Sequence, residues 1–165
     1  MIQSKILQPK RAVALAFLFC GSSALAADLA IGSELGASEW GAGHVKGMRA
    51  EIVQSGDFNE ALTQQKGLLH IARILQIGDD NISSFVQHGR ANQATLIQSG
   101  AGNEVQLSQS GRGNHAHVEQ AGNGQRALIG QAGNGNLVDI RQGPLSPDVG
   151  LQQHGNGLAA RVIQY

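Results

Sequence analysis

The sequence predicts an all-β fold: a parallel two-sheet β-solenoid of amyloid type, with about five 22-residue coils of strand, turn, strand and turn. Three observations predict it. Glutamine recurs every eleven residues, glycine and asparagine follow it at fixed offsets, and small or apolar residues occupy alternate positions before the next glutamine. Four Phe, one Trp and one Tyr in 165 residues supply too little aromatic surface for an ordinary core, so a repeat has to organise the chain.

Residues 1–26 are predicted to be a secretory signal peptide. Lys5, Lys10 and Arg11 form its basic region, an apolar run follows, and Ala24-Leu25-Ala26 supplies a small-x-small cleavage site. The apolar run is too short to span a bilayer as a helix. We therefore expect export and cleavage after Ala26.

The composition of the processed chain excludes several classes of chemistry. Cys20 follows the large Phe19, which disfavours lipoprotein processing, so the cysteine is interpreted as an apolar signal residue that is removed. Neither disulfides nor thiolate catalysis is then expected. The remaining nine basic and twelve acidic residues give a net charge of −3. Without a basic stripe, nucleic acid is not an expected partner.

Residues 27–49 are predicted to be a loosely ordered N-terminal leader. Gly43 stands where an earlier glutamine of the repeat would fall, whereas Ala50 and Ile52 already follow the strand pattern. We therefore place the solenoid domain at residues 50–165.

The repeat is defined by glutamines spaced by eleven residues without interruption. The eleven members are Gln54, Gln65, Gln76, Gln87, Gln98, Gln109, Gln120, Gln131, Gln142, Gln153 and Gln164.

Turn-forming residues follow these glutamines, because glycine and asparagine tolerate left-handed backbone. Two positions later the glycines are Gly56, Gly67, Gly78, Gly89, Gly100, Gly111, Gly122, Gly133 and Gly155, with Pro144 as the exception. Five positions later the asparagines are Asn59, Asn81, Asn92, Asn103, Asn114 and Asn136, with His70, Gln125, Pro147 and Leu158 as departures.

Each repeat ends in a short strand with one apolar face. A small or β-branched residue occurs seven positions after the glutamine and a mostly large apolar residue nine positions after it, as in Ala94 and Leu96 before Gln98. Positions two apart on a strand share a face, so all three point inward. Such a strand cannot bury its face alone, and stacked coils about 4.8 Å apart would form a body about 24 Å tall.

The inward glutamines are predicted to form two ladders, one on each sheet. An unpaired buried amide costs roughly 2–7 kcal/mol, and a neighbouring rung supplies the missing partner. Asparagines at the turns are expected to form ladders likewise. A misplaced coil would break every amide pair, so these ladders are expected to fix the register.

The ends of such a solenoid are expected to recruit further strands. Each end exposes unpaired backbone groups, and soluble repeat proteins cover theirs with atypical polar caps. The last unit here keeps an ordinary strand, residues 160–164, and no convincing cap is evident at either end. End-to-end growth, as in amyloid, follows from this pattern.

The repeat resembles that of the curlin family over about 115 of the 165 residues. The shared pattern is glutamine, glycine two later, asparagine five later, a small residue seven later and glutamine eleven later. The resemblance implies a subunit of curli, the extracellular amyloid fibres of biofilm matrix. It also implies other curlin subunits as partners, in homo- or heteropolymers, and export through the outer-membrane curli machinery to the cell surface.

Two features resemble the minor member of the curlin pair, which nucleates the major one. The segment after the signal lacks the Gly/Asn-rich leader expected of a major subunit, and the ending Leu158 to Gln164 is similar to the carboxy-terminal ends of minor subunits. The alternatives are a major curlin subunit and a monomeric solenoid adhesin or binding protein. The mixed outward positions, among them Arg73, Thr95 and His117, disfavour a flat ligand-binding face.

No catalytic, cofactor-binding or metal-binding residue is predicted, and neither a cofactor nor a small-molecule substrate is expected. His115 and His117 could share a metal, but no third ligand recurs in register, so they are interpreted as surface histidines. The turns are too short to build the cleft of a β-helix enzyme. Pro144 and Pro147 predict an irregular corner that is either tolerated or a local defect in the stack.

Overall fold

The computed structural model describes residues 13–20 and 47–165, and all of its regular structure is β-strand. The strands are β1 (Val13–Cys20), β2 (Arg49–Ser55), β3 (Glu60–Leu68), β4 (Ile71–Ile77), β5 (Ile82–Arg90), β6 (Gln93–Ser99), β7 (Glu104–Arg112), β8 (His115–Ala121), β9 (Arg126–Asn134), β10 (Leu137–Gln142), β11 (Val149–His154) and β12 (Ala159–Gln164). Most of the predicted signal and leader, residues 1–12 and 21–46, lies outside the described residues.

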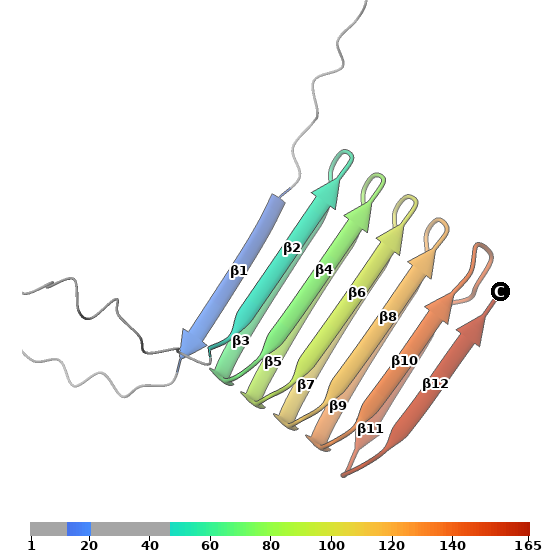
Figure 1. Cartoon of the computed structure of the whole chain (residues 1–165). Coiled ribbons are helices and arrows are strands. Elements are labelled where there is room, and N and C mark those ends of the chain that lie inside the picture. Colours follow the sequence, from blue (N-terminus) through green and yellow to red (C-terminus); the bar gives the residue numbers. More distant parts are fainter. Residues whose placement is uncertain (1–12, 21–46) are drawn as a thin grey trace, which may run out of the picture.

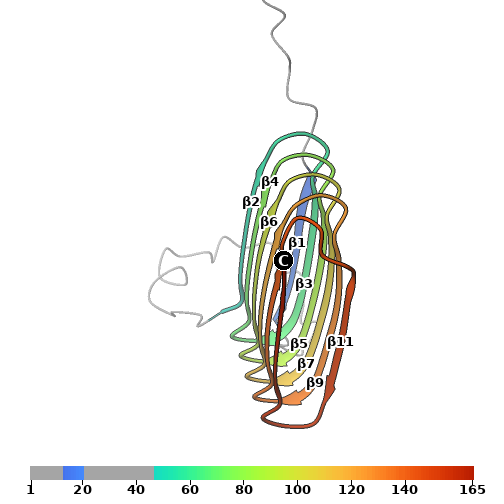
Figure 2. The ribbon, with the colours of Figure 1, turned by 90° about the vertical axis from the view of Figure 1, so that its right-hand side faces the viewer.

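The strands alternate between two parallel six-stranded sheets, which confirms the predicted β-solenoid. Sheet A has the order β1-β3-β5-β7-β9-β11, and sheet B has the order β12-β10-β8-β6-β4-β2. Consecutive strands therefore lie in opposite sheets, and the rungs rise in sequence order (Figure 1). Viewed along the stack, each coil is a narrow flattened ring with one sheet on each long side (Figure 2).

The register repeats every 22 residues along both sheets. Gln76 pairs with Gln98 in sheet B, and Gln87 pairs with Gln109 in sheet A, so each residue lies beside its equivalent in the next coil. Identical environments thus recur up the column. This register is a direct consequence of two eleven-residue units per coil.

The core is a thin double layer between the sheets. Small residues such as Ala94 and Val105 alternate along the strands with large ones such as Leu96 and Leu107, and all four are at most 2% exposed. The seven-after and nine-after positions of each repeat form this core, as their period of two requires. One aromatic side chain, Phe85, is buried among the described residues.

The strands are longer in sheet A than the sequence pattern predicts. We predicted Gly67, Gly89, Gly111 and Gly133 as turn residues, but each lies within the last residues of a sheet A strand. Gly67 pairs with Gly89, and Gly89 with Gly111, although their φ angles are positive. Because every coil bends in the same way, backbone pairing continues into the bend.

Candidate functional site

Two ladders of glutamine side chains run up the inside of the solenoid. Ladder A contains the glutamines of sheet A, and Gln65 Nε2 donates to Gln87 Oε1 at 2.7 Å in its first rung. Ladder B contains those of sheet B, and Gln76 Nε2 donates to Gln98 Oε1 at 2.8 Å. Nine of the eleven repeat glutamines are buried, and the two terminal members of ladder B, Gln54 and Gln164, are half-buried.

The remaining rungs follow the same pattern. Ladder A continues through Gln87, Gln109, Gln131 and Gln153, with Nε2-to-Oε1 distances of 2.7–2.9 Å. Ladder B joins Gln54 to Gln76 at 2.7 Å and continues through Gln98, Gln120, Gln142 and Gln164, lengthening to 3.5 Å in the last rung.

Both ladders have one chemical direction. In these rungs the amide nitrogen donates to the carbonyl oxygen of the glutamine 22 residues later. The second proton of the amide is used as well: Gln109 Nε2 also donates to Gln93 O at 3.0 Å across the core. The ladder therefore ties adjacent coils together and also ties one sheet to the other.

The ladder direction leaves different chemistry at its two ends. At the N-terminal end, the buried Oε1 of Gln65 accepts no hydrogen bond within the described residues. At the C-terminal end, Gln153 Nε2 donates only to Leu137 O, at 3.1 Å, among those residues. The first end thus presents an acceptor and the last end presents amide donors.

The asparagines form corner columns, but their partners differ from those expected. Asn92 Oδ1 accepts from the backbone nitrogen of Asn114 at 3.0 Å, while Asn92 Nδ2 donates to Gly111 O at 3.2 Å. We expected a side-chain amide ladder like that of the glutamines. One direct Asn–Asn side-chain bond is present among the described residues, from Asn81 Nδ2 to Asn59 Oδ1 at 3.1 Å. The shorter side chain reaches the neighbouring backbone instead.

His70 replaces asparagine at the start of one corner column. Its Nδ1 accepts from the backbone nitrogen of Asn92 at 3.2 Å, and its Nε2 contacts Lys66 O at 3.1 Å. The ring is 0% exposed. Burial lowers the pKa of His70, because the charged imidazolium would lose its hydration. The neutral ring with its proton on Nε2 reproduces the acceptor and donor of an asparagine.

The irregular corner with its prolines keeps the hydrogen bond that a repeat glutamine donates to the backbone carbonyl five residues later. Gln142 Nε2 donates to Pro147 O at 2.8 Å, just as Gln76 Nε2 donates to Asn81 O at 3.2 Å. Gln125, the preceding member of this column, donates through Nε2 to Gly143 O. The stack therefore continues through the corner, although β10 and β11 shorten to six residues.

A second set of left-handed corner positions was missed by the sequence reasoning. Four positions after the glutamine, the φ angle is positive at Phe58, Leu69, Asp80 and Ala91, and then at Gly102, Gly113, Gly124, Gly135 and Gly157. A non-glycine residue in this conformation costs about 1–2 kcal/mol. The signal was present in the sequence, since Gly-Asn-Gly triplets such as residues 122–124 place glycine at this position.

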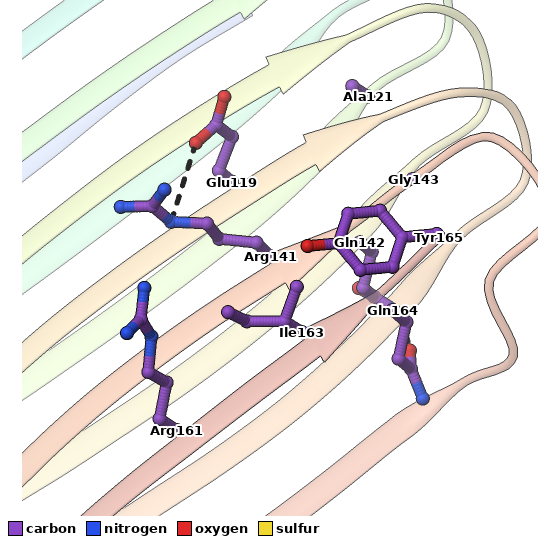
Figure 3. A pocket seen from close by; sticks show the side chains of 9 residues that line it. All are labelled: Glu119, Ala121, Arg141, Gln142, Gly143, Arg161, Ile163, Gln164 and Tyr165. Carbon is purple, nitrogen blue, oxygen red and sulfur yellow. Dashed lines mark hydrogen bonds and ion pairs between the residues drawn. The ribbon is translucent and has the colours of Figure 1, made fainter.

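The outer faces carry charged rows that are paired along the stack. Arg161 lies 3.2 Å from Asp139, and Arg73 lies 3.8 Å from Glu51, with all four side chains at least partly exposed. Near the C-terminal end these rows border an open groove of about 320 Å³. Figure 3 shows Arg141 reaching toward Glu119 there, at 4.0 Å. Because its arginines are paired with acids, the groove offers no uncompensated charge to a ligand.

Other kinds of site find no support in the described part of the chain. No group of three or more His, Cys, Asp or Glu side chains within residues 13–20 and 47–165 could hold a metal. His115 is exposed and His117 half-buried, and both lie on the outer face of β8. In the same residues no helix is long and apolar enough to cross a membrane.

Comparison with known proteins identifies the repeat. The family model described as the curlin associated repeat matches residues 86–111 and again residues 111–143. The first match runs from the end of β5 through β6 and β7, and the second covers β8, β9 and β10. No curated protein and no solved structure matches the chain.

Proposed function

We propose that this chain, a member of the curlin repeat family, is the minor subunit of extracellular curli fibres and nucleates polymerisation of the major subunit at the cell surface. The family and the β-solenoid are structural rather than enzymatic. The observation that carries the proposal is the pair of uninterrupted glutamine ladders, which repeat every 22 residues up to both ends of the described solenoid.

Templating follows from the geometry of those ends. A strand that joins the stack gains a row of backbone hydrogen bonds together with one glutamine rung, so its register is set by the strand beneath. Any chain with the same eleven-residue pattern meets this requirement. Other curlin subunits are therefore the partners we propose, and the curli export apparatus would deliver the chain to the outer surface.

The nucleating role is supported by the sequence features that resemble minor subunits. A nucleator presents a formed edge to unassembled partners, which removes the slow step of building the first coils. The stacked, internally hydrogen-bonded coils meet that description. A major subunit is the second candidate, because the same ladders also permit this chain to polymerise with itself.

Seeding separates these roles. A trace of the processed chain is added to freshly dissolved major curlin subunit, and thioflavin fluorescence is followed. Abolition of the lag is expected for a nucleator. An unchanged lag, with slow fibre growth by this chain alone, would identify a major subunit. Absence of fibres under both conditions would refute a fibre role and favour a monomeric solenoid binder.

A matched pair of variants tests whether seeding depends on the glutamine ladder. Gln109→Leu alters an inward rung, whereas Gln106→Leu makes the same chemical change on the exposed face of the same strand, β7. We expect seeding to be weakened by Gln109→Leu and retained by Gln106→Leu. Equal seeding by both variants would show that the ladder is not the template.

A further inference from the structure

We infer that copies of this chain stack with a half-turn rotation about the column axis, so that β12 of one copy pairs with β3 of the next and β11 pairs with β2. This inference rests on the proposed fibre role and on the predicted removal of residues 1–26. The partner is a second copy of this chain, and the surface is the N-terminal end of the column, formed by β3 of sheet A and β2 of sheet B.

The first step concerns the strand that covers this edge in the full chain. β1 pairs in parallel with β3, and its register places Leu18 beside Gln65. Leucine has no amide to donate, and the buried Oε1 of Gln65 is left without a hydrogen bond. β1 therefore covers the edge without completing the ladder, and its removal with the signal would expose a strand whose missing partner should carry glutamine at that register.

The second step is the supply of that glutamine. In every rung the donor comes from the earlier coil, so the partner of Gln65 has to present an Nε2 group from the C-terminal end of another copy. Gln153 of β11 and Gln164 of β12 lie at that end. Within the described residues, Gln164 donates no hydrogen bond and Gln153 donates only to Leu137 O.

The third step excludes β11 as the strand that docks on β3. Consecutive strands rise in alternating sheets, so β2 lies half a coil below β3 and β12 lies half a coil above β11. If β11 paired with the next copy's β3, then β12 and that copy's β2 would occupy the same place in sheet B. β12, carrying Gln164, is left as the strand that reaches Gln65.

Counting strands selects the half-turn over a direct stack. In a direct stack, the next copy is not rotated, so sheet B continues into sheet B and β12 pairs with β2 of that copy. One strand is then missing in sheet A, between β11 and the next copy's β3. The strands from β2 to β12 number eleven, an odd number, so an unbroken column exchanges the two sheets at each junction. In the half-turn stack β12 meets β3 and β11 meets β2, with no gap.

The two sheets are interchangeable enough for this exchange. Both are built from the same eleven-residue unit, so Ala160, Val162 and Gln164 would lie beside Ala61, Thr63 and Gln65 of the next copy. The direct stack has one advantage, since it would bring Arg161 beside Glu51. An exposed ion pair contributes little, whereas an absent strand leaves a whole row of backbone groups and core side chains uncovered.

Disulfide trapping distinguishes the two registers. In the half-turn stack Ile163 lies beside Gln64 of the next copy, and in the direct stack it lies beside Val53. All three side chains are outward and exposed, and neighbouring strands bring their Cα atoms to about 4.8 Å, within disulfide range. The processed chain has no native cysteine, so Ile163→Cys is mixed with either Gln64→Cys or Val53→Cys, assembled and mildly oxidised.

We expect the mixture with Gln64→Cys to form at least tenfold more dimer on non-reducing gels than the mixture with Val53→Cys. Fibres that trap the Val53 pair preferentially, or neither pair, would overturn the half-turn stack while leaving the fibre role intact. Fibre formation is scored separately by thioflavin fluorescence and electron microscopy. Its absence for the unmodified chain would refute the fibre role and this inference together.

Discussion

Replacing the central rung of ladder A should destabilise the stack far more than the size of the change suggests. Gln109 is 1% exposed and lies in β7, the middle of the five sheet A strands from β3 to β11. It accepts from Gln87 at 2.8 Å and donates to Gln131 at 2.7 Å and to Gln93 O at 3.0 Å. Gln109→Leu removes all three hydrogen bonds and keeps a similar volume.

The size of the stability loss follows from the buried polar groups that lose their hydrogen-bond partner. Gln131 Oε1 and Gln93 O lose this donor, and Gln87 Nε2 keeps only its bond to Ile71 O at 3.2 Å. Each orphaned group costs about 1–2 kcal/mol, and the buried leucine returns about 1–2 kcal/mol of transfer free energy. The expected net loss of stability is about 3 kcal/mol.

Guanidinium titration of the assembled chain measures this loss. With an m-value of about 3–4 kcal/mol per M, the midpoint of dissolution should fall by about 0.8–1 M. Gln106→Leu, on the exposed face of the same strand, should shift the midpoint by less than about 0.2 M. Equal midpoints for the two variants would refute the reasoning, because burial and hydrogen bonding would then make no difference.

Three further substitutions test other parts of the column. His70→Asn should remove a pH dependence of stability. Burial lowers the pKa of His70 in the fold, so the parent chain should lose stability as pH falls below about 6.5, whereas the variant should not. Denaturant midpoints from about pH 8 to about pH 5 measure this difference. Of the groups that act on this ring, His88 is a titratable side chain, whereas Lys66 contributes its backbone carbonyl; a slope unchanged in the variant would point to other groups. Gly111→Ala should block coil stacking, because its Cβ would lie 2.0 Å from Gly133 O at a φ of +117°. In the control Gly113→Ala the new Cβ meets no atom within 4 Å, and the fold should lose only about 1–2 kcal/mol of stability. Comparable thioflavin kinetics for the two variants would contradict this. Asp139→Asn should lower the free energy of unfolding by less than about 1 kcal/mol and leave fibre yield unchanged, since its partners Arg141 and Arg161 are half-exposed. A larger loss of stability that disappears in high salt would show that the outer charged rows stabilise the stack.

The eleven-residue period was sufficient to predict which side chains face inward. A strand has only two faces, so once Gln98 is buried, Leu96 and Ala94 must be buried with it, and the structure places them so. Stacking identical units then leaves one simple register. The two sheets, the 22-residue coil and the inward ladders all follow from these two constraints.

The corners were less predictable because several residue types satisfy the same geometry. Asn92 was expected to pair with other amide side chains, but its side chain, shorter than that of glutamine, bonds to backbone groups of the next coil. The left-handed backbone at Phe58 and Leu69 was not predicted, because neither residue favours it and the signal lies in the glycines that later repeats carry at this position. The role of His70 was hidden for a similar reason: its ring nitrogens imitate an asparagine only when buried and neutral.

The pairing of β1 with sheet A could not be predicted from the repeat pattern either. Its residues lack the repeat, and we predicted them as part of a signal that is removed. In the full chain they pair with the edge of β3, which shows that this edge accepts a parallel strand even without a matching glutamine. That tolerance is what a templating edge requires.

Side-chain hydrogen exchange in assembled fibres tests the glutamine ladder most directly. Gln64 and Gln65 are neighbours in β3, as Gln152 and Gln153 are in β11, yet in each pair the first is exposed and the second is buried. Selective nitrogen-15 labelling with solid-state NMR should show slow exchange of the amide protons of Gln65 and Gln153 and rapid exchange for Gln64 and Gln152. Equally rapid exchange within both pairs would mean that the repeat glutamines face solvent, which would contradict a column held by internal amide rungs.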